Sequence, residues 1–189
     1  MATPKATISL ICSRLSTYAV VCTAAFLVAS ALAPAVSSRA FPANGSPTRL
    51  DSPEAQMLEL TNQDRTAQQN WEETQGRAHP LRWDDRLAAV ARAHSEDMAR
   101  AGSLSHEGSD GSAPSQRVSY MGIQWLSTGE NIARAHDAAE AESLFMDEPK
   151  FQPNHRSNIL NPNYTIVGIG VARDSEGALY ITEDFAQLR

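Results

Sequence analysis

Two histidines and one glutamate stand apart from the apolar pattern of the chain. His106 lies in the serine- and glycine-rich stretch SLSHEGSDG, Glu130 lies in GEN and His155 lies in HRSNIL, at spacings of 24 and 25 residues. Two imidazoles and one carboxylate are the ligand set of a catalytic zinc site that keeps one position open. Spacing alone does not bring the three side chains together. If the fold does so, they predict a small polar site for a divalent cation, most naturally zinc.

Three predicted helices flank this trio. A serine followed by a proline indicates the start of a helix over 52–69. Apolar residues at helical spacing predict a second helix over 84–101, which Gly102 would end. A capping pattern and a following proline predict a third helix over 137–148. The segment HRSNIL that follows is expected to form a single helical turn.

Three polar residues on these helices leave two interpretations open. Asn62 and Arg65 share one face of the first helix, which is either solvated or bonded to loop carbonyls or a carboxylate beneath it. His94 falls on the apolar stripe of the second helix, between Leu87 and Met98, and therefore points inward. A lone histidine on such a stripe is more often a hydrogen-bonded core residue than a ligand, and we favour the structural interpretation.

The end of the chain changes from helical to alternating periodicity. Val167, Ile169 and Val171 alternate with two glycines, the turn RDSEG follows, and a second alternating run covers 179–185. This pattern is typical of a β-hairpin, and the glycines leave room for a helix or loop to press against one strand. A further strand is expected near TGENIA. Helices and strands in this order predict an α+β layered domain.

The first forty residues have the layout of a secretory signal. Basic residues precede an apolar run over about 15–36, and small residues end it. We expect a signal peptide over 1–40, a short linker over 41–51 and one domain over 52–189 that is secreted and has no membrane span after cleavage. The apolar run is also long enough to cross a bilayer, so an anchor formed by an uncleaved N-terminal helix is the alternative.

Removal of residues 1–40 changes both the charge and the cysteine content. It takes away three of the 16 basic residues and none of the 22 acidic ones, which leaves 13 against 22 and a formal charge of −9. An acidic domain with scattered arginines offers no surface for nucleic acid, which we exclude as a partner. Cys12 and Cys22 both lie in the removed segment, so the mature domain is expected to contain no disulfide.

Six segments occur in an order that resembles a known family. They are LTNQDR, PLRWDDRLAAVARAHSEDMA, LSHEGSDGSAPSQR, GENIA, HRSNIL and YTIVGIGVARDSEGALYITEDFA. Together they resemble the bacterial branch of the CAP superfamily, also called the SCP domain, which groups cysteine-rich secretory proteins, insect venom antigens and plant pathogenesis-related proteins. The resemblance covers about residues 57–185. It implies an α-β-α sandwich with a central antiparallel sheet between helices, and a shallow cleft lined by histidine and glutamate.

The resemblance assigns the cleft residues individually. His106 and His155 match the two cleft histidines and Glu130 matches a cleft glutamate, and these are the family's candidate ligands for a divalent cation such as zinc. The glutamate that precedes the second histidine in eukaryotic members is Asn154 here. Glu148 is a candidate replacement, but an acidic residue at a helix end is more often solvated, and we favour that interpretation. The rim segment MDEPKFQPN is longer than in bacterial members and lacks their tryptophan, so we expect a reshaped rim.

The resemblance does not imply one agreed reaction, because members have been linked to lipid binding, to signalling and toxin roles, and to proteolysis. We favour a secreted, monomeric, non-catalytic binding module whose cleft holds a small or lipid-like ligand, with or without a cation. A purely structural role for the polar trio ranks second. A metal-dependent hydrolase ranks third, because activated water needs a general base and no HExxH helix is present. A serine nucleophile at Ser105 or Ser157 ranks last, because no GxSxG elbow occurs.

Overall fold

A computed structural model describes residues 52–189 of the chain. The expected signal peptide over 1–40 and linker over 41–51, with both cysteines, lie outside the described residues. Within 52–189, no helix combines the length and the apolar character that crossing a membrane requires.

Helices and strands follow one another in the order of a layered α+β domain. The helices are α1 (Pro53–Thr66), η1 (Gln68–Asn70), α2 (Trp71–Thr74), α3 (Asp85–Ala101), α4 (Pro114–Tyr120), α5 (Ala138–Met146) and α6 (His155–Leu160). The strands are β1 (Arg82–Trp83), β2 (Trp125–Ala135), β3 (Ile166–Arg173) and β4 (Leu179–Leu188). They form one sheet in the order β1-β3-β4-β2, in which β4 is antiparallel to both β2 and β3, and β1 is parallel to β3.

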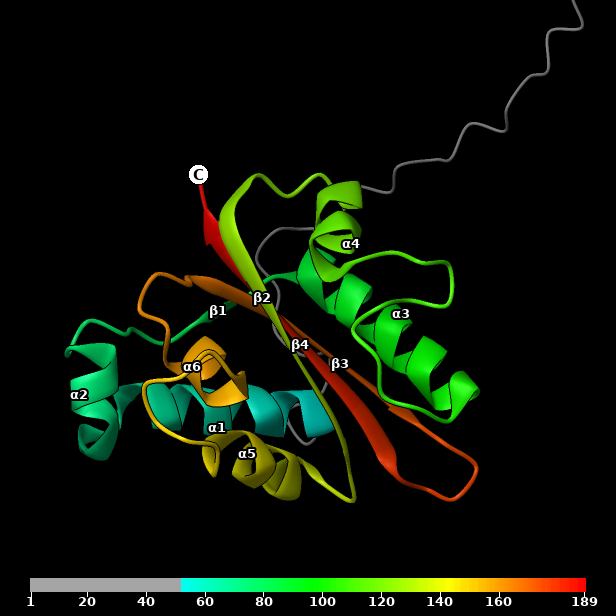
Figure 1. The fold of residues 1–189 in the computed structure, drawn as a ribbon, viewed down its shortest axis with the longest axis horizontal. Helices are drawn as coiled ribbons and strands as arrows, with labels where there is room; N and C mark the ends of the chain where they lie inside the picture. Colours follow the sequence, from blue (N-terminus) through cyan, green and yellow to red (C-terminus); the bar gives the residue numbers. More distant parts are fainter. Residues whose placement is uncertain (1–51) are drawn as a thin grey trace, which may run out of the picture. The chain divides into compact units, whose positions relative to one another are not determined.

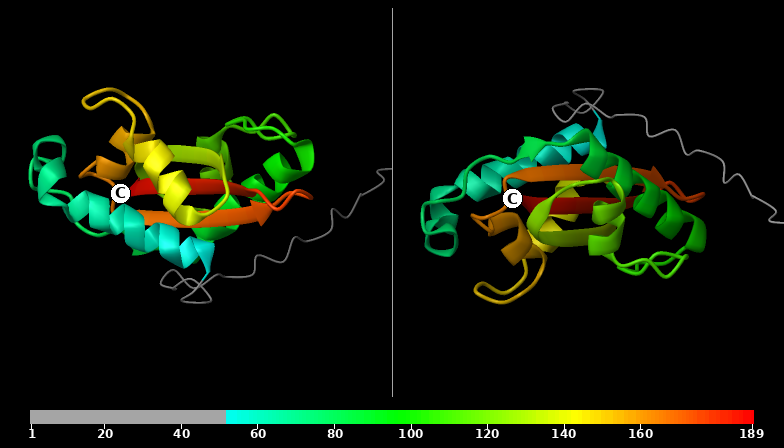
Figure 2. Two further views of the ribbon diagram at one scale, coloured as in Figure 1. Left: turned by 90° about the horizontal axis from the view of Figure 1, so that it is seen from below. Right: turned by 90° about the horizontal axis from the view of Figure 1, so that it is seen from above.

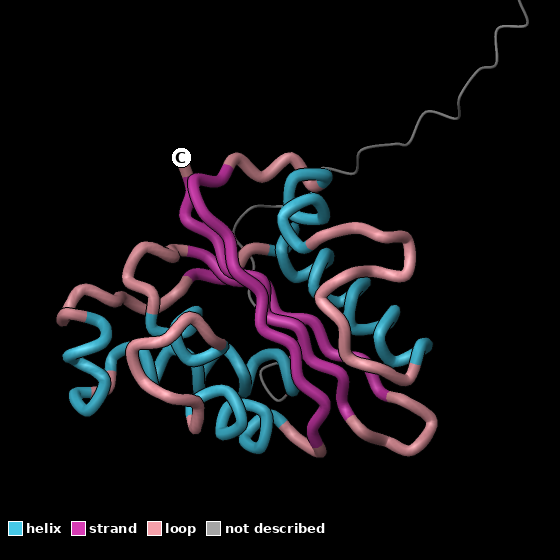
Figure 3. The backbone as a smooth tube through the Cα atoms, in the orientation of Figure 1, coloured by secondary structure: helices cyan, strands magenta, loops and turns pink. Residues whose placement is uncertain are grey.

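Helices cover both faces of this sheet (Figures 1 and 2). α3 and α4 lie on one side of the strands, and α1, α5 and α6 lie on the other. The tube in Figure 3 shows the three long strands side by side between the two groups of helices. Because both faces are covered, every residue of β4 from Leu179 to Ala186 is buried. The predicted α-β-α sandwich is confirmed.

Two glycines of β3 allow α3 to lie directly on the sheet. A Cβ atom added to Gly168 would lie 2.0 Å from the backbone nitrogen of Ala88, and one added to Gly170 would lie 2.0 Å from that of Arg92. Any side chain at these positions would force the helix away from the strand. The expectation that the glycines admit a helix is therefore correct.

The sequence pattern missed the short elements. The first helix ends at Thr66 rather than near 69, because Ala67 takes an extended conformation and η1 and α2 follow. α4 and β1 were not expected either. β1 has only two residues, and it exists because Arg82 and Trp83 pair with β3. Such an element is set by its distant partner and leaves no periodicity in its own segment.

Polar side chains of α1 bond the end of α6, the segment between α6 and β3, and the segment that leads to β1. Arg65 is buried, and burial lowers its pKa to about 10. Its guanidinium donates hydrogen bonds to the backbone carbonyls of His79, Ile159, Asn161 and Tyr164. Asn62 bonds the backbone of Leu81 in both directions, at 3.2 and 2.6 Å. Of the two open interpretations, binding to loop carbonyls is therefore correct.

Candidate functional site

Glu130 is the centre of the polar site. It lies within β2, and only 2% of its side chain is exposed. Its Oε1 is 2.7 Å from Nδ1 of His106, and its Oε2 accepts a hydrogen bond of 2.6 Å from Nη2 of Arg117. Because the two oxygens bond different partners, the carboxylate holds the His106 loop and α4 against the sheet.

Arg117 is the residue that fixes this loop, and the sequence pattern did not identify it. From α4, its guanidinium donates to the carbonyl oxygens of His106, at 3.1 Å, and Ser112, at 2.7 Å. It therefore ties both ends of the SHEGSDGS segment while it neutralises Glu130. The sequence contained one signal that could have identified Arg117. Pro114 is typical of the first turn of a helix, and such a helix places Arg117 one turn later.

His155 is held by a carboxylate from the reshaped rim. It is the first residue of α6, and Asn154 caps that helix by accepting a hydrogen bond from the Ser157 backbone. Glu148 bonds His155 twice, through Nδ1 at 2.8 Å and through the backbone nitrogen at 2.7 Å. The expectation that Glu148 is solvated is therefore wrong, because the unpaired backbone N–H and the imidazole of His155 together attract it.

The two histidines face the same region of the molecule. Their ring centroids are 6.5 Å apart, and the ring of Phe145 packs 5.0 Å from that of His155. His106 is about half exposed, whereas His155 is about one third exposed. The structure therefore brings His106, Glu130 and His155 into one polar cluster, which Arg117 and Glu148 complete. We call these five residues the His–Glu cluster.

Two asparagines lock the backbone under this cluster. Asn158 of α6 donates to the carbonyl oxygen of Glu130 at 3.3 Å and to the side chain of Asn131 at 2.9 Å. Asn131, which follows Glu130 in the sequence, donates in turn to the carbonyl oxygen of His155 at 3.2 Å. The GEN and HRSNIL motifs therefore bond each other directly, which explains why both carry asparagine.

Two further titratable side chains lie behind Glu130. His94 is buried, which lowers its pKa, and its Nε2 is 2.8 Å from the carbonyl oxygen of Ser105 and 3.9 Å from Glu130 Oε1. Asp184 pairs with Glu130 across β2 and β4. Burial, followed by the charge of Glu130, raises the pKa of Asp184 well above its usual range. His94 is thus a hydrogen-bonded core residue, as favoured from the sequence, whereas Asp184 is a buried acid that the sequence pattern did not reveal.

The donor atoms of the cluster suit a cation held by imidazoles. Each histidine engages a carboxylate through Nδ1, which fixes the ring and leaves Nε2 as the atom for a ligand. Within residues 52–189, no group of three or more His, Cys, Asp or Glu side chains is arranged to hold a metal ion. The reason is local, since Glu130 uses both oxygens on His106 and Arg117. Glu130 therefore orients the His106 ring through Nδ1 and is not placed as a ligand next to Nε2.

The neighbouring serines are used in local turns. Ser105 Oγ donates to the carbonyl oxygen of Glu107 and accepts from its backbone nitrogen, at 2.9 and 3.0 Å. Ser157 Oγ accepts from the Asn154 backbone nitrogen at 2.9 Å and donates to its carbonyl oxygen at 2.8 Å. Neither hydroxyl bonds a histidine in the described part of the chain, so neither has the base that a serine nucleophile needs.

Comparison with known proteins gives relatives of unknown activity. The chain is 32% identical over 139 residues to the uncharacterised Bacillus subtilis protein YkwD, which covers 73% of this chain and 49% of that protein. It is 32% identical over 133 residues to the uncharacterised Bacillus subtilis membrane protein YlbC, which covers 70% of this chain and 34% of that protein. The chain thus spans between one third and one half of the length of these curated relatives.

Solved structures share the fold. An extracellular SCP-domain protein of Bacillus anthracis superposes with a TM-score of 0.58 at 27% identity, over 71% of this chain and 40% of that one. An outer surface protein of Borrelia burgdorferi gives a TM-score of 0.59 at 15% identity, over 73% and 96%. Residues 58–185 match the cysteine-rich secretory protein family, known as CAP. This stretch contains the whole His–Glu cluster and the sandwich that positions it, and the chain belongs to the CAP family.

Proposed function

We propose that this CAP domain is a secreted, non-catalytic binding module whose His–Glu cluster holds a divalent cation, zinc first, through His106 and His155. The observation that carries the proposal is that each imidazole has its Nδ1 fixed by a carboxylate, Glu130 in one case and Glu148 in the other. Zinc-binding histidines in proteins are usually oriented in this way. Two imidazole ligands would leave coordination positions open for an oxygen of a small or lipid-like ligand.

Binding is favoured over hydrolysis because the carboxylates near the histidines are held in place by other partners. A metal-bound water needs a base whose oxygen can reach it. Glu130 is 2% exposed and its oxygens face His106 and Arg117, and Glu148 is held against the ring and backbone of His155. We therefore expect no zinc-dependent turnover of peptide or ester substrates.

A purely structural role is the second candidate, and the contacts of Arg117 favour it. This side chain joins the His106 loop to Glu130, so the cluster stabilises the fold with or without a cation. The two roles differ in what zinc does. A structural cluster predicts a melting temperature that zinc does not change, whereas a cation site predicts a rise of the melting temperature.

The test is thermal unfolding of the chelator-treated protein with and without zinc. A ligand present at 100 times its Kd stabilises the native state by about 2.7 kcal/mol, so the melting temperature should rise by several degrees. His106→Ala and His155→Ala should each abolish the rise. His136→Ala is the matched control, because His136 is exposed and also bonds a glutamate, Glu140, through Nδ1. Equal zinc responses in all four proteins would refute the proposed site.

A further inference from the structure

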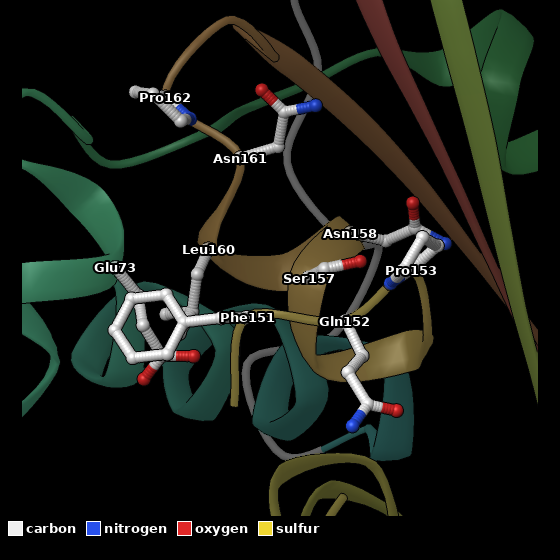
Figure 4. A pocket seen from close by; sticks show the side chains of 9 residues that line it. All are labelled: Glu73, Phe151, Gln152, Pro153, Ser157, Asn158, Leu160, Asn161 and Pro162. Atoms are coloured by element: carbon white, nitrogen blue, oxygen red, sulfur yellow. The ribbon is translucent and has the colours of Figure 1, made fainter. Parts of the chain in front are cut away.

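A pocket lies beside α6, and no residue of the His–Glu cluster lines it. It has a volume of about 400 Å³ and is formed by α2, α6 and the rim loop between α5 and α6. Its lining consists of Glu73, Phe151, Gln152, Pro153, Ser157, Asn158, Leu160, Asn161 and Pro162, and none of the cluster residues takes part. Figure 4 shows the lining side chains, which come from α2, from the loop and from α6 and the residues that follow it. A volume of this size is typical of a small-molecule site.

Phe151 is held in this pocket at the expense of stability. Its side chain is 70% exposed, and its backbone has a φ of 59°, a left-handed conformation that bulky residues rarely adopt. Neither the exposed ring nor the strained backbone helps the fold. Strained residues of this kind are concentrated at ligand-binding positions, where the strain is retained for function.

The rim loop that carries Phe151 is fixed at several points. Arg156 forms a two-pronged ion pair with Glu73, at distances from 2.7 to 3.2 Å, and donates to the carbonyl oxygen of Met146 at 2.6 Å. Asn154 also donates to the carbonyl oxygen of Pro149 at 2.8 Å. The pocket is therefore formed before any ligand arrives, which reduces the entropy cost of binding.

The charges of the pocket indicate a neutral ligand. Glu73 is the one charged residue in the lining, and Arg156 neutralises it. The remaining polar groups are amides and a hydroxyl. The exposed Gln152 amide forms no hydrogen bond within residues 52–189, whereas Asn158 spends both Nδ2 hydrogens on Glu130 and Asn131. A free amide that both donates and accepts matches hydroxyl groups, which do the same.

We propose that this pocket binds a neutral saccharide, with one sugar ring against the face of Phe151 and its hydroxyls bonded to the Gln152 amide. An aromatic face offers apolar area to the C–H groups of the ring, and the amide satisfies its hydroxyls. A lipid chain would leave this amide unpaired. An extended peptide fits less well, because the lining contains no strand edge and only one aromatic residue.

The test is a nuclear magnetic resonance titration of the ¹⁵N-labelled protein with chitotriose, cellotriose and maltotriose. At least one trisaccharide should shift the backbone amide signals of 151–152 and 157–161 in a saturable way, whereas Pro153 and Pro162 have no amide N–H to report. Phe151→Ala should weaken binding at least about tenfold, as expected for an aromatic anchor. Phe151→Trp should retain binding. Tyr120→Ala is the control, because Tyr120 is an 83% exposed aromatic residue outside the pocket, and it should bind like the parent.

Phe151→Gly separates a ligand-binding role from a structural one. Glycine adopts a left-handed φ without strain, so this variant should melt no lower than the parent and yet lose the sugar. The proposal is overturned if none of the three sugars shifts these signals at millimolar concentration. It is also overturned if a proline-rich peptide shifts them and the sugars do not, or if Phe151→Ala and Tyr120→Ala bind equally. Zinc is not needed for any of these results, so they are independent of the cation site.

Discussion

At the residue scale, a single buried carboxylate organises the site. Glu130 contacts His106 and Arg117 directly, and the buried Asp184 pairs with it on the neighbouring strand. The sequence singled out Glu130 as one member of a set of two histidines and a glutamate, and the resemblance to the CAP superfamily placed it in the cleft. Arg117 and Asp184 could not be found in this way. One lies in a helix without strong periodicity, and the other sits in an alternating strand where an acid is normally solvated.

Arg117 should matter more for stability than its partly exposed position suggests. Arg117→Ala would leave Glu130 buried without its cation, and breaking a buried pair costs about 3 kcal/mol or more. Urea unfolding at pH 7 should show this loss in the free energy of unfolding. Arg134→Ala is the control, since Arg134 pairs with Asp174 and Glu176 on the exposed surface and should cost little. Equal small losses in both variants would contradict the role given to Arg117.

At the element scale, the long helices and the hairpin were predictable because each has a local signal. Ser52 and Asp137 cap α1 and α5, and Gly102 ends α3 in a left-handed conformation. The short elements α2, α4 and β1 were missed because tertiary partners define them. The position of Glu148 was missed for a related reason. Its partner is the start of α6, and only the path of the intervening loop brings the two together.

The contact between α3 and β3 gives a sharp prediction. Gly168→Ala places a methyl group 2.0 Å from a backbone atom of α3, and a backbone atom cannot rotate away as a side chain can. The free energy of unfolding should fall by about 3 kcal/mol. Gly111→Ala serves as control, because Gly111 has a φ of 79° and no atom within 4 Å, so it should lose only about 1 kcal/mol of backbone strain. Similar losses for both variants in urea unfolding would show that α3 and β3 move apart at little cost in free energy.

At the scale of the whole molecule, two buried acids connect helices to the sheet. Glu142 of α5 and Glu183 of β4 both meet Thr61 of α1. Thr61 Oγ1 lies 3.2 Å from Glu142 Oε2 and 2.8 Å from Glu183 Oε1, and Asn131 donates to the other oxygen of Glu183 at 3.1 Å. The Thr61 hydroxyl has one hydrogen, so when it donates to Glu183 an ionised Glu142 would have no donor. Burial raises the pKa of Glu142 to about 10 and that of Glu183 to about 7. The native state therefore holds a proton here at neutral pH.

This pair makes stability fall as the pH rises. Raised pKa values mean that the folded protein binds protons which the unfolded chain has released above about pH 4.5. The contribution is complete below that pH and is lost as the pH rises through about 7 for Glu183 and about 10 for Glu142. The slope is at most about 1.4 kcal/mol per pH unit for each proton. Urea unfolding between pH 5 and pH 9 should show a steady loss in the parent.

Glu142→Gln tests the origin of this slope. The amide mimics the protonated acid, so the variant should lose less stability than the parent between pH 7 and pH 9. Glu59→Gln, an exposed change on α1, should keep the slope of the parent. If the Glu142 variant keeps that slope as well, the buried pair is not its source.

The measurement that tests the central claim most directly is calorimetric titration of zinc into the chelator-treated protein at pH 7.5 and at pH 5.5, beside His155→Ala. We predict micromolar or tighter binding of one zinc ion at pH 7.5. The affinity should be much weaker at pH 5.5, where imidazoles protonate, and binding should be lost in the variant. Absence of heat at pH 7.5 with a folded protein, or equal binding by His155→Ala, would contradict the cation site. The His–Glu cluster would then have a purely structural role.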